Sequence, residues 1–440
     1  MKNEMNTKIY DRACESIAGG LLTNFKSAKG AQSIYIESAS GARLKDYDGN
    51  TYYDFALTFG PAILGHSNTR YQQALMNQIQ KLYTCEFSIV QIEAAEKIKS
   101  CVKGLDVMRF TPSGNEADAQ AIRVARGYTK KNYVVKFTSH FHGGPDCIVG
   151  GVVHDPTFPV VSAGEYDNDY WSHACNTQGR ARHSLDDTMM IEFNNLPQIQ
   201  ELFEAHGNDI ACVIMEPVPL NLNGIIASKE YMRGVRELCS KHNVIMIYDE
   251  ILTGFRIGLG GAAEFYGVRP DLWVFSKAIG GGFPVAVYGG KREIMDVITN
   301  CEVLAPGTFN GHPLACAAIL NVLEQLSEND CAAYKHMNRL GEKLKQGLLE
   351  KAKKNGVDMI IQGFPAALCP VFTKRNRINT QSEAMQYANI RAYYVFGALM
   401  KKYGVLNNGR FCVGLAHTDE DVAYAVEVSD KAFRELRELL

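Results

Sequence analysis

Residues 244–290 read VIMIYDEILTGFRIGLGGAAEFYGVRPDLWVFSKAIGGGFPVAVYGG, with three short apolar runs separated by glycine-rich and polar segments. The runs VIMIYD, LWVFS and VAVYGG are continuous rather than alternating, which is typical of strands covered on both faces. The first run ends at Asp249 and Glu250, and the second ends close to Lys277. This stretch therefore predicts buried strands whose ends carry ionisable groups.

The pattern continues upstream with further apolar runs and with segments of helical periodicity between them. Strands are expected at DVMRF, YVVKF and ACVIME, and helices at TRYQQALMNQIQKL, IEAAEKIKSCV and NEADAQAIRVARGYT. Helices that alternate with buried strands indicate an α/β protein with a mostly parallel sheet. We expect this large domain to span residues 66–315, with an irregular insertion over 145–190 that forms a functional loop or is disordered.

A chain of 440 residues is too long for one ordinary core, so a second unit is expected. After GTFNGHP the pattern changes to a helix over PLACAAILNVLEQL and to helices near 334–354, 381–402 and 418–438, with short strands DMIIQ and AALCPVFT. These features predict a smaller α+β domain over 316–440. Residues 1–65 are expected to be irregular with short strands around the turn at 48–50, and to join the small domain.

Composition excludes several classes of function. The chain has 46 basic and 48 acidic side chains, a formal charge of -2, which argues against nucleic-acid or polybasic membrane binding. No apolar stretch is long enough to cross a bilayer, and the polar start MKNEMNTKIYDR argues against secretion, so we expect a cytoplasmic protein. The 12 cysteines form no CxxC pair, which removes the commonest zinc and dithiol signatures.

The ionisable residues at the strand ends indicate a chemistry. Glu216 follows ACVIM, Asp249 ends VIMIY, and Lys277 follows LWVFS. Pyridoxal 5′-phosphate (PLP) needs a lysine for a Schiff base and an acid that keeps its ring nitrogen protonated, and Lys277 and Asp249 suit these roles. The alternative is structural: Asp249 caps a helix and Lys277 extends to solvent. A possible phosphate-binding loop at residues 113–115 favours the cofactor-binding interpretation over the structural one.

Two loops could complete such a site. Ser113, Gly114 and Asn115 open a helix directly after DVMRF, so their N–H groups could hold a phosphate, although a plain serine N-cap would have the same sequence. Phe141 could stack on a pyridine ring with His142 near it. His140 and His142 also raise the possibility of a metal pair, but no further ligands cluster with them in the sequence, so no metal is expected.

These residues carry a resemblance to the class III aminotransferases of fold type I, in a branch similar to glutamate-1-semialdehyde 2,1-aminomutase. The motifs follow the family order over almost the whole chain; they include GPAILGHS, TPSGNEAD, YDEILTGFRIGLGGAAEFYGVRPDL, SKAIGGGFPVAVYGGKREIM, GTFNGHPLA and LAHTDEDV. The resemblance implies a PLP enzyme in which Lys277 forms the Schiff base and Asp249 pairs with the ring nitrogen.

The resemblance also implies roles for the surrounding residues. Ile251 and Phe141 would enclose the ring, and Asn221 would lie near its phenolic oxygen, with Glu216 in a supporting role. Ser113, Gly114 and Asn115 would hold the phosphate together with Thr308 from the other subunit, so a homodimer with a shared site is expected.

Two positions depart from the aminomutase pattern. The aminomutase has an N-terminal arginine that holds the substrate carboxylate, and the matching residue here is Lys26, which lacks the bidentate fork. Before LAHT the aminomutase has a glutamate where this chain has Gly409, followed by Arg410. Arg410 resembles an arginine that binds a substrate carboxylate in related transaminases of β-amino or D-amino acids.

The sequence thus predicts an aminotransferase that moves an amino group between an amino-acid donor and a keto or aldehyde acceptor. The alternative is an isomerase on the same scaffold, either a glutamate-1-semialdehyde-type aminomutase or an amino-acid racemase. A binding protein without cofactor would have lost Lys277 or Asp249, and both are present.

Overall fold

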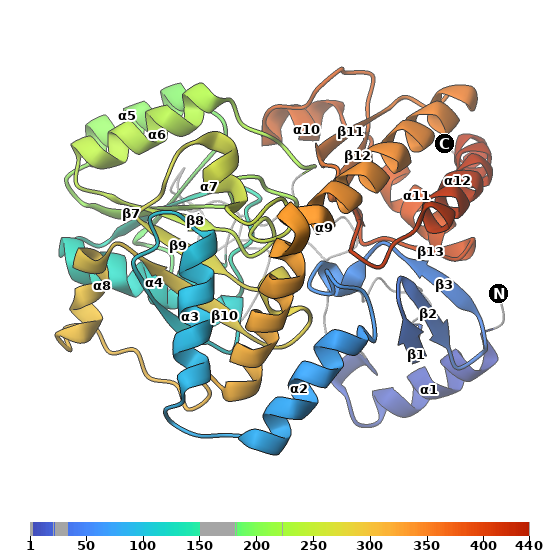
Figure 1. The fold of residues 1–440 in the computed structure, drawn as a ribbon. Coiled ribbons are helices and arrows are strands. Elements are labelled where there is room, and N and C mark those ends of the chain that lie inside the picture. Colours follow the sequence, from blue (N-terminus) through green and yellow to red (C-terminus); the bar gives the residue numbers. More distant parts are fainter. Residues whose placement is uncertain are drawn as a thin grey trace.

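A seven-stranded sheet forms the centre of the larger part of the protein, as seen in the computed structural model, which describes residues 3–20, 22, 34–149, 181, 183–221 and 223–439 (Figure 1). Strands β5 to β9 pair in parallel, whereas β10 runs antiparallel to both of its neighbours. The mostly parallel sheet that we predicted is therefore confirmed. In sheet order the strands are β4 (Val107–Thr111), β10 (Ala286–Gly290), β9 (Leu272–Phe275), β8 (Ile245–Asp249), β7 (Ile210–Met215), β5 (Tyr133–Phe137) and β6 (Thr188–Ile191).

Helices cover both faces of this sheet, which explains the continuous apolar runs. Alternate strand residues join two separate cores: Ile245 and Ile247 pack in one, and Met246 and Tyr248 in the other. The first core includes α4 (Gly114–Thr129) and α8 (Arg292–Thr299). The second includes α3 (Ile89–Cys101), α5 (Leu196–His206), α6 (Lys229–Lys241), the short α7 (Gly261–Tyr266) and the start of α9 (Pro313–Lys354).

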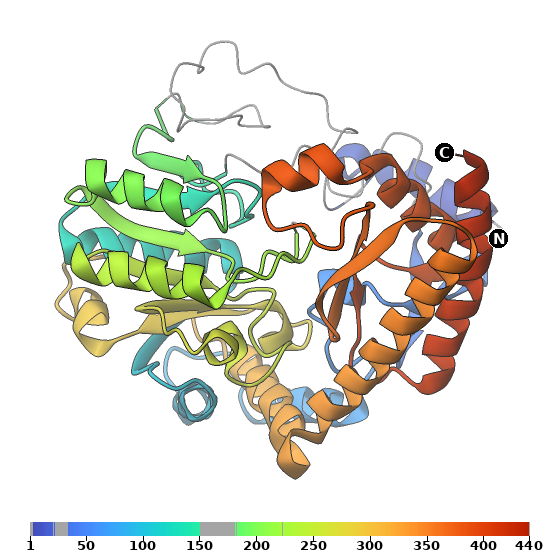
Figure 2. The same cartoon turned by 90° about the horizontal axis from the view of Figure 1, so that it is seen from above.

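Two small sheets, one built mainly from N-terminal strands and the other from C-terminal strands, lie beside the large one (Figure 2). In one of them, β3 pairs in parallel with β13, so residues near 53 lie beside residues near 405. The four strands are β1 (Ile36–Ser40), β2 (Arg43–Asp46), β3 (Thr51–Asp54) and β13 (Val405–Leu406). The other sheet contains β11 (Met359–Phe364), β12 (Ala367–Phe372) and β14 (Phe411–Cys412), with α11 (Ile390–Lys402) and α12 (Asp419–Leu439) nearby.

Several predicted elements were wrong in detail. The N-terminal segment contains an unexpected helix, α1 (Glu4–Cys14), and β6 lies at the end of the stretch expected to be irregular. Two helices were expected around residue 330, and this is confirmed, because α9 consists of two helical segments separated at residues 328–331, where the backbone angles are not helical. It crosses the expected domain boundary at 315/316. The helix expected over 381–402 is two, α10 (Gln381–Tyr387) and α11.

The helix α2 (Thr69–Lys81) packs against α9, and the N-terminal end of α4 faces the ends of the central strands. Among the described helices, none combines the length and the apolar character that crossing a membrane would require.

Candidate active site

A cavity of about 690 Å³ lies where β7, β8 and β9 end and α4 begins. The carboxyl ends of parallel strands are where open α/β sheets place their ligands. Eight of the predicted site residues line this cavity: Gly114, Asn115, Phe141, Glu216, Asn221, Asp249, Ile251 and Lys277. The fold therefore brings together, from five separate segments, the groups that the sequence placed at strand and helix ends.

Lys277 enters the cavity from the turn after β9. Its backbone φ is 48°, in the left-handed region that a residue with a side chain seldom adopts. Such a conformation costs on the order of 1–3 kcal/mol and persists where the surroundings enforce it, often at functional sites. Burial and the positive charge of Arg410 together lower the pKa of Lys277 to about 8, against the opposing effect of Asp249. A larger neutral fraction at physiological pH makes this amine a better nucleophile.

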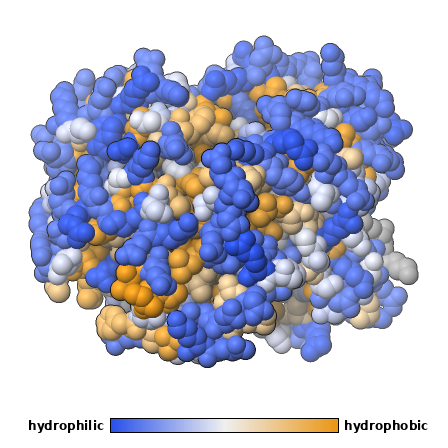
Figure 3. Space-filling view, viewed as in Figure 1, coloured by the Kyte–Doolittle hydropathy of each residue, from blue (hydrophilic) through white to orange (hydrophobic). Residues whose placement is uncertain are grey.

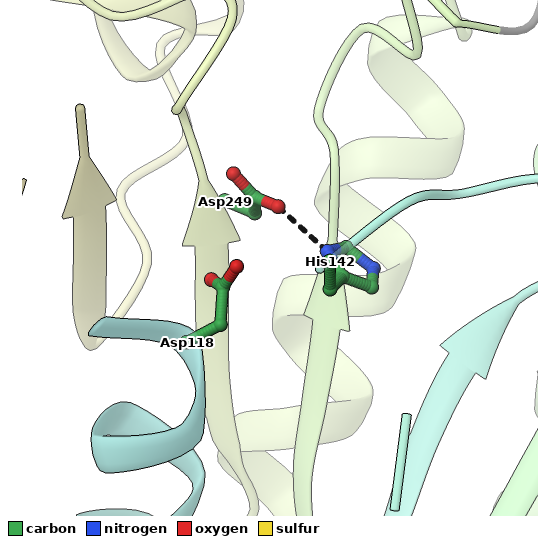
Figure 4. Close-up of side chains that lie close together, drawn as sticks. All are labelled: Asp118, His142 and Asp249. Carbon is green, nitrogen blue, oxygen red and sulfur yellow. Dashed lines mark hydrogen bonds and ion pairs between the residues drawn. The ribbon is translucent and has the colours of Figure 1, made fainter. Parts of the chain in front are cut away.

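Asp249 ends β8, the strand that pairs with β9, and lines the cavity (Figure 4). Its Oδ2 lies 2.7 Å from Nδ1 of His142, and its Oδ1 accepts a hydrogen bond of 2.9 Å from the N–H of Ile251. Burial raises the pKa of the Asp249 carboxyl, while the Ile251 N–H and the charge of Lys277 oppose the rise. A nearby cation, such as a protonated ring nitrogen, would favour the ionised form.

His142 does not line the cavity but lies behind Asp249, fully buried, so it reaches a ligand only through that carboxylate. Burial lowers the pKa of His142 well below its ordinary value, with a further contribution from the charge of Lys136. A neutral imidazole in contact with a carboxylate donates its Nδ1–H, which fixes the tautomer. His142 therefore orients Asp249.

Asp118 of α4 joins this pair, although the sequence analysis did not select it (Figure 4). One ligand-type atom from each of Asp118, His142 and Asp249 lies within 4.8 Å of the others. We had expected no ligand cluster around His142, and the fold shows one. Because the His142–Asp249 hydrogen bond uses the atoms that an ion would need, we interpret the cluster as support for Asp249. Asp118 lies at helical spacing from Ala121, Ile122 and Ala125, which are all buried. A charged residue on the apolar face of a predicted helix was the sequence feature that could have identified it.

The start of α4 forms the wall expected to hold a phosphate. Ser113 is the N-cap, and its hydroxyl accepts a 3.3 Å hydrogen bond from the N–H of Glu116, so the structural alternative for this serine is also realised. A Cβ on Gly114 would come within 2.5 Å of the Ile251 side chain, so any larger residue there would displace Ile251. Asn115 accepts a hydrogen bond from the N–H of Gly144, which fixes the neighbouring loop.

A chain of hydrogen bonds connects the far wall of the cavity to the C-terminal segment. Glu216 accepts from the N–H of Phe141 at 2.8 Å, and Nδ2 of Asn221 donates to Glu216 at 3.4 Å. Nη1 of Arg410 in turn donates to Oδ1 of Asn221 at 2.9 Å. Burial raises the pKa of Glu216, and the negative charge of Asp249 adds to the rise. A neutral Glu216 would leave Arg410 as an uncompensated positive charge beside the cavity.

Besides His142, three predicted residues that the structure describes do not line the cavity. Arg410 is 5% exposed and reaches it only through Asn221, and Ser113 lies at its edge with its hydroxyl in the N-cap. Thr308 is exposed and lies outside the cavity of its own chain. Lys26 falls outside the described residues. The cavity also includes residues that were not predicted, namely Leu22, Gly143, Gly144, Leu252 and Ser276, and three of these five are adjacent in sequence to a predicted residue.

Comparison with known proteins identifies the family. The model of the aminotransferase class-III family matches residues 26–432. This chain belongs to the class III aminotransferase family. Within the family, the chain is 34% identical to glutamate-1-semialdehyde 2,1-aminomutase of Persephonella marina, over 99% of this chain and all of the relative. It is 36% identical to the protein of that name from Alkaliphilus oremlandii, over 98% of each chain.

Solved structures of similar proteins agree with the fold. An omega-transaminase from Sphaerobacter thermophilus superposes with a TM-score of 0.87 at 25% identity, over 98% of both chains. A glutamate-1-semialdehyde aminomutase from Pseudomonas aeruginosa superposes with a TM-score of 0.85 at 23% identity, over 98% of this chain and 94% of the other. The predicted fold type I architecture is thereby confirmed.

The predicted cofactor, pyridoxal 5′-phosphate, is confirmed by the family. The cavity fits it, because a lysine amine, a buried carboxylate and the free N–H groups of a helix start converge there. When bound, PLP supplies an aldehyde that condenses with amines and a ring that withdraws electrons. The names of the relatives favour the isomerase alternative over the aminotransferase that we predicted first.

Proposed function

We propose that this class III enzyme is a transaminase that acts on a carboxylate-bearing amino compound and on a keto or aldehyde acceptor. The observation that carries the proposal is Arg410, a buried guanidinium one hydrogen bond away from the cavity. In the described part of the chain it forms no ion pair, and its Nε has no hydrogen-bond partner. A buried charge without a counter-ion is costly, so its retention favours an anionic ligand.

The residues of the cavity would have different roles in this reaction. Lys277 would hold the cofactor and, once a substrate amine has displaced it, would accept the proton from the substrate carbon. Asp249 would keep the ring nitrogen protonated, while Ile251 and Phe141 would enclose the ring from two sides. Ser113, Gly114 and Asn115 would hold the phosphate at the start of α4. Asn221 would lie near the phenolic oxygen, within reach of Glu216.

The second candidate is an intramolecular aminomutase, which the names of the sequence relatives favour. Against it stands the position of Gly409, where the aminomutase pattern has a glutamate and this chain has a backbone φ of 76°. A Cβ at this glycine would overlap the hydroxyl of Tyr393, so no glutamate fits without rearrangement. Substitution here therefore changes the shape of the loop as well as its charge.

One assay separates the two candidates. Purified enzyme loaded with PLP is mixed with glutamate or a β-amino acid, with and without a keto-acid acceptor, and separately with glutamate-1-semialdehyde. A transaminase needs the acceptor for more than one turnover, whereas an aminomutase converts the semialdehyde repeatedly without one. Sustained conversion of glutamate-1-semialdehyde alone would replace our proposal by the second candidate.

We further propose a homodimer that completes each site with Thr308 of the second subunit. Exposed apolar side chains gather where α2 leads into α3, and the orange surface at the lower left of Figure 3 marks this region. They include Phe87, which is 83% exposed, as well as Tyr83, Ile89 and Ile92. The loop that carries Thr308 adds the exposed Leu304 and Phe309. Apolar patches of this kind mark interaction surfaces, and large apolar interfaces are typical of obligate dimers.

A further inference from the structure

Asp118 is a buried acid for which the proposed reaction has so far no use. It lies in the second turn of α4, its side chain is 0% exposed, and neither carboxyl oxygen has a hydrogen-bond partner among the described residues. Figure 4 shows the carboxyl pointing from α4 towards Asp249, on a different side from His142. An unpaired buried polar group is destabilising, typically by about 1–3 kcal/mol.

The two carboxyl groups differ in the hydrogen bonds that they receive. Asp249 accepts from the N–H of Ile251 and contacts the ring of His142, whereas no described donor reaches Asp118. Hydrogen bonds to an ionised carboxylate favour that form, and two adjacent buried carboxyls do not both ionise. When the pair holds one proton, that proton therefore belongs on Asp118.

The surroundings agree with this assignment. Burial raises the pKa of Asp118 well above its ordinary value, and the charges of Asp249 and Glu216 raise it further, with only Lys277 acting in the opposite direction. The helical neighbours of Asp118 on the buried face are Ala121, Ile122 and Ala125, so an apolar side chain would suit the position better for packing.

We propose that Asp118 is a positioning residue that holds a proton beside Asp249 and thereby keeps Asp249 ionised for the ring nitrogen of the cofactor. The inference rests on the proposed role of Asp249 as the partner of that nitrogen. A neutral acid at 118 can donate its proton in a hydrogen bond to Asp249 after a small rotation, because the ligand atoms of the cluster lie within 4.8 Å. It adds a donor to Asp249 without adding a second negative charge.

The test measures the ring nitrogen directly in the holoenzyme. Wild type and variants are loaded with PLP labelled with nitrogen-15, and the chemical shift reports whether the nitrogen is protonated. Binding of PLP is compared with that of a cofactor analogue in which carbon replaces the ring nitrogen. The variants are Asp118→Asn, which stays neutral and keeps a donor, and Asp118→Val with the smaller Asp118→Ala, which have no donor.

We expect Asp118→Asn to keep the protonated signal. In Asp118→Val and Asp118→Ala the signal should move towards that of the neutral ring, and the preference for PLP over the analogue should fall on the order of 10- to 100-fold, as for loss of a hydrogen bond to a charged group. Thermal unfolding should be unchanged or shifted upwards, since the unpaired acid is gone. A purely structural role predicts the reverse: lower stability with the wild-type signal and preference.

Asp249→Ala, measured alongside, separates two failures. If Asp249→Ala changes the signal and the apolar variants at 118 do not, Asp118 has no positioning role and Asp249 keeps its assignment. If Asp249→Ala leaves the nitrogen-15 signal unchanged, another residue pairs with the ring nitrogen. In that case both the role of Asp249 and the positioning role of Asp118 are refuted.

Discussion

The guanidinium of Arg410 donates a hydrogen bond of 2.9 Å to the side-chain oxygen of Asn221, across the boundary between the C-terminal elements and the central sheet. Asn221 lines the cavity and also contacts Glu216. The guanidinium of Arg410 therefore contacts a residue of the cavity wall but does not line the cavity itself. Under the proposed function, a substrate carboxylate would compete with Asn221 as the acceptor of this hydrogen bond. Substitution of Arg410 is therefore the most direct test of substrate specificity.

Arg410→Ala should therefore weaken the reaction with carboxylate-bearing donors. A desolvated, charge-assisted contact of this kind is worth on the order of 2–5 kcal/mol. Single-turnover kinetics, followed by the visible absorption of the bound cofactor, measure the loss for each donor. Arg410→Lys keeps the charge but lacks the bidentate guanidinium, so it should recover only part of the rate that is lost in Arg410→Ala. An amine without a carboxylate is the control substrate, and equal losses for both substrate classes would contradict carboxylate recognition.

Lys277 should carry the cofactor covalently. Borohydride reduction of PLP-loaded protein followed by peptide mapping is expected to place a pyridoxyl group on Lys277. Lys136, which is also buried, serves as an internal control because it bonds to the carbonyl of Ile148 away from the cavity. A label on any lysine other than Lys277 would refute the assignment.

Cofactor capture should depend on pH in a defined direction. The pKa of Lys277 is lowered to about 8, and only the unprotonated amine attacks an aldehyde. The rate at which apoprotein takes up PLP should thus rise with pH below about 8 and level off above it. Because Arg410 contributes to the lowering, Arg410→Ala should move the profile to higher pH. Stopped-flow absorbance measures both profiles, and a variant profile that moves to lower pH would count against this electrostatic coupling.

Asp249→Ala should retain the fold and some cofactor binding but lose most catalysis, at least on the order of 100-fold, as when a preorganised electrostatic group is removed. Removal of the carboxylate also leaves Nδ1 of His142 without its partner, a destabilisation of about 1–3 kcal/mol in denaturant unfolding. Asp249→Asn is the matched variant, since it preserves shape and a contact to His142 but lacks the charge. Turnover like that of wild type in either variant would assign the ring nitrogen to another group.

Phe87→Asp should dissociate the proposed dimer and reduce activity without unfolding the subunit, because the side chain is 83% exposed in the single chain. Met385→Asp is a matched control on α10, where the methionine is 77% exposed and lies far from α2 and α3 in Figure 1. Light scattering and activity are compared across protein concentrations. An active monomer in the wild type, or equal effects of both variants, would exclude the shared site.

The sequence predicted the central sheet and most of the cavity because both depend on short-range patterns. Strands β7 and β8 are apolar on both faces, and the ionisable residues Glu216, directly after β7, and Asp249, at the end of β8, line the cavity. What it did not predict depends on contacts distant in the chain. Helix α1 has a single buried side chain, Asn6, which is held by Asp46 and Asp48 rather than by an apolar face.

The same distinction explains the other errors. Strand β6 has only four residues and is identified by its pairing with β5, more than 50 residues earlier. Asp118 follows the helical periodicity of α4, yet its meaning comes from Asp249, which the fold alone brings close. The role of a residue that supports another side chain depends on tertiary contacts, so the local sequence pattern does not predict it.

The pairing of β3 with β13 joins residues near 53 to residues near 405, and this long loop has a consequence for biosynthesis. As the chain emerges from the ribosome, every strand of the central sheet and both Asp249 and Lys277 are available before the last third of the protein has been translated. Strands β1 to β3 can pair with one another early, but β3 must wait for its partner β13, and contacts of such high sequence separation form slowly. Arg410 follows β13 by only a few residues, so Lys277 emerges long before it, and the arginine that we propose for carboxylate binding would be among the last parts of the site to fold.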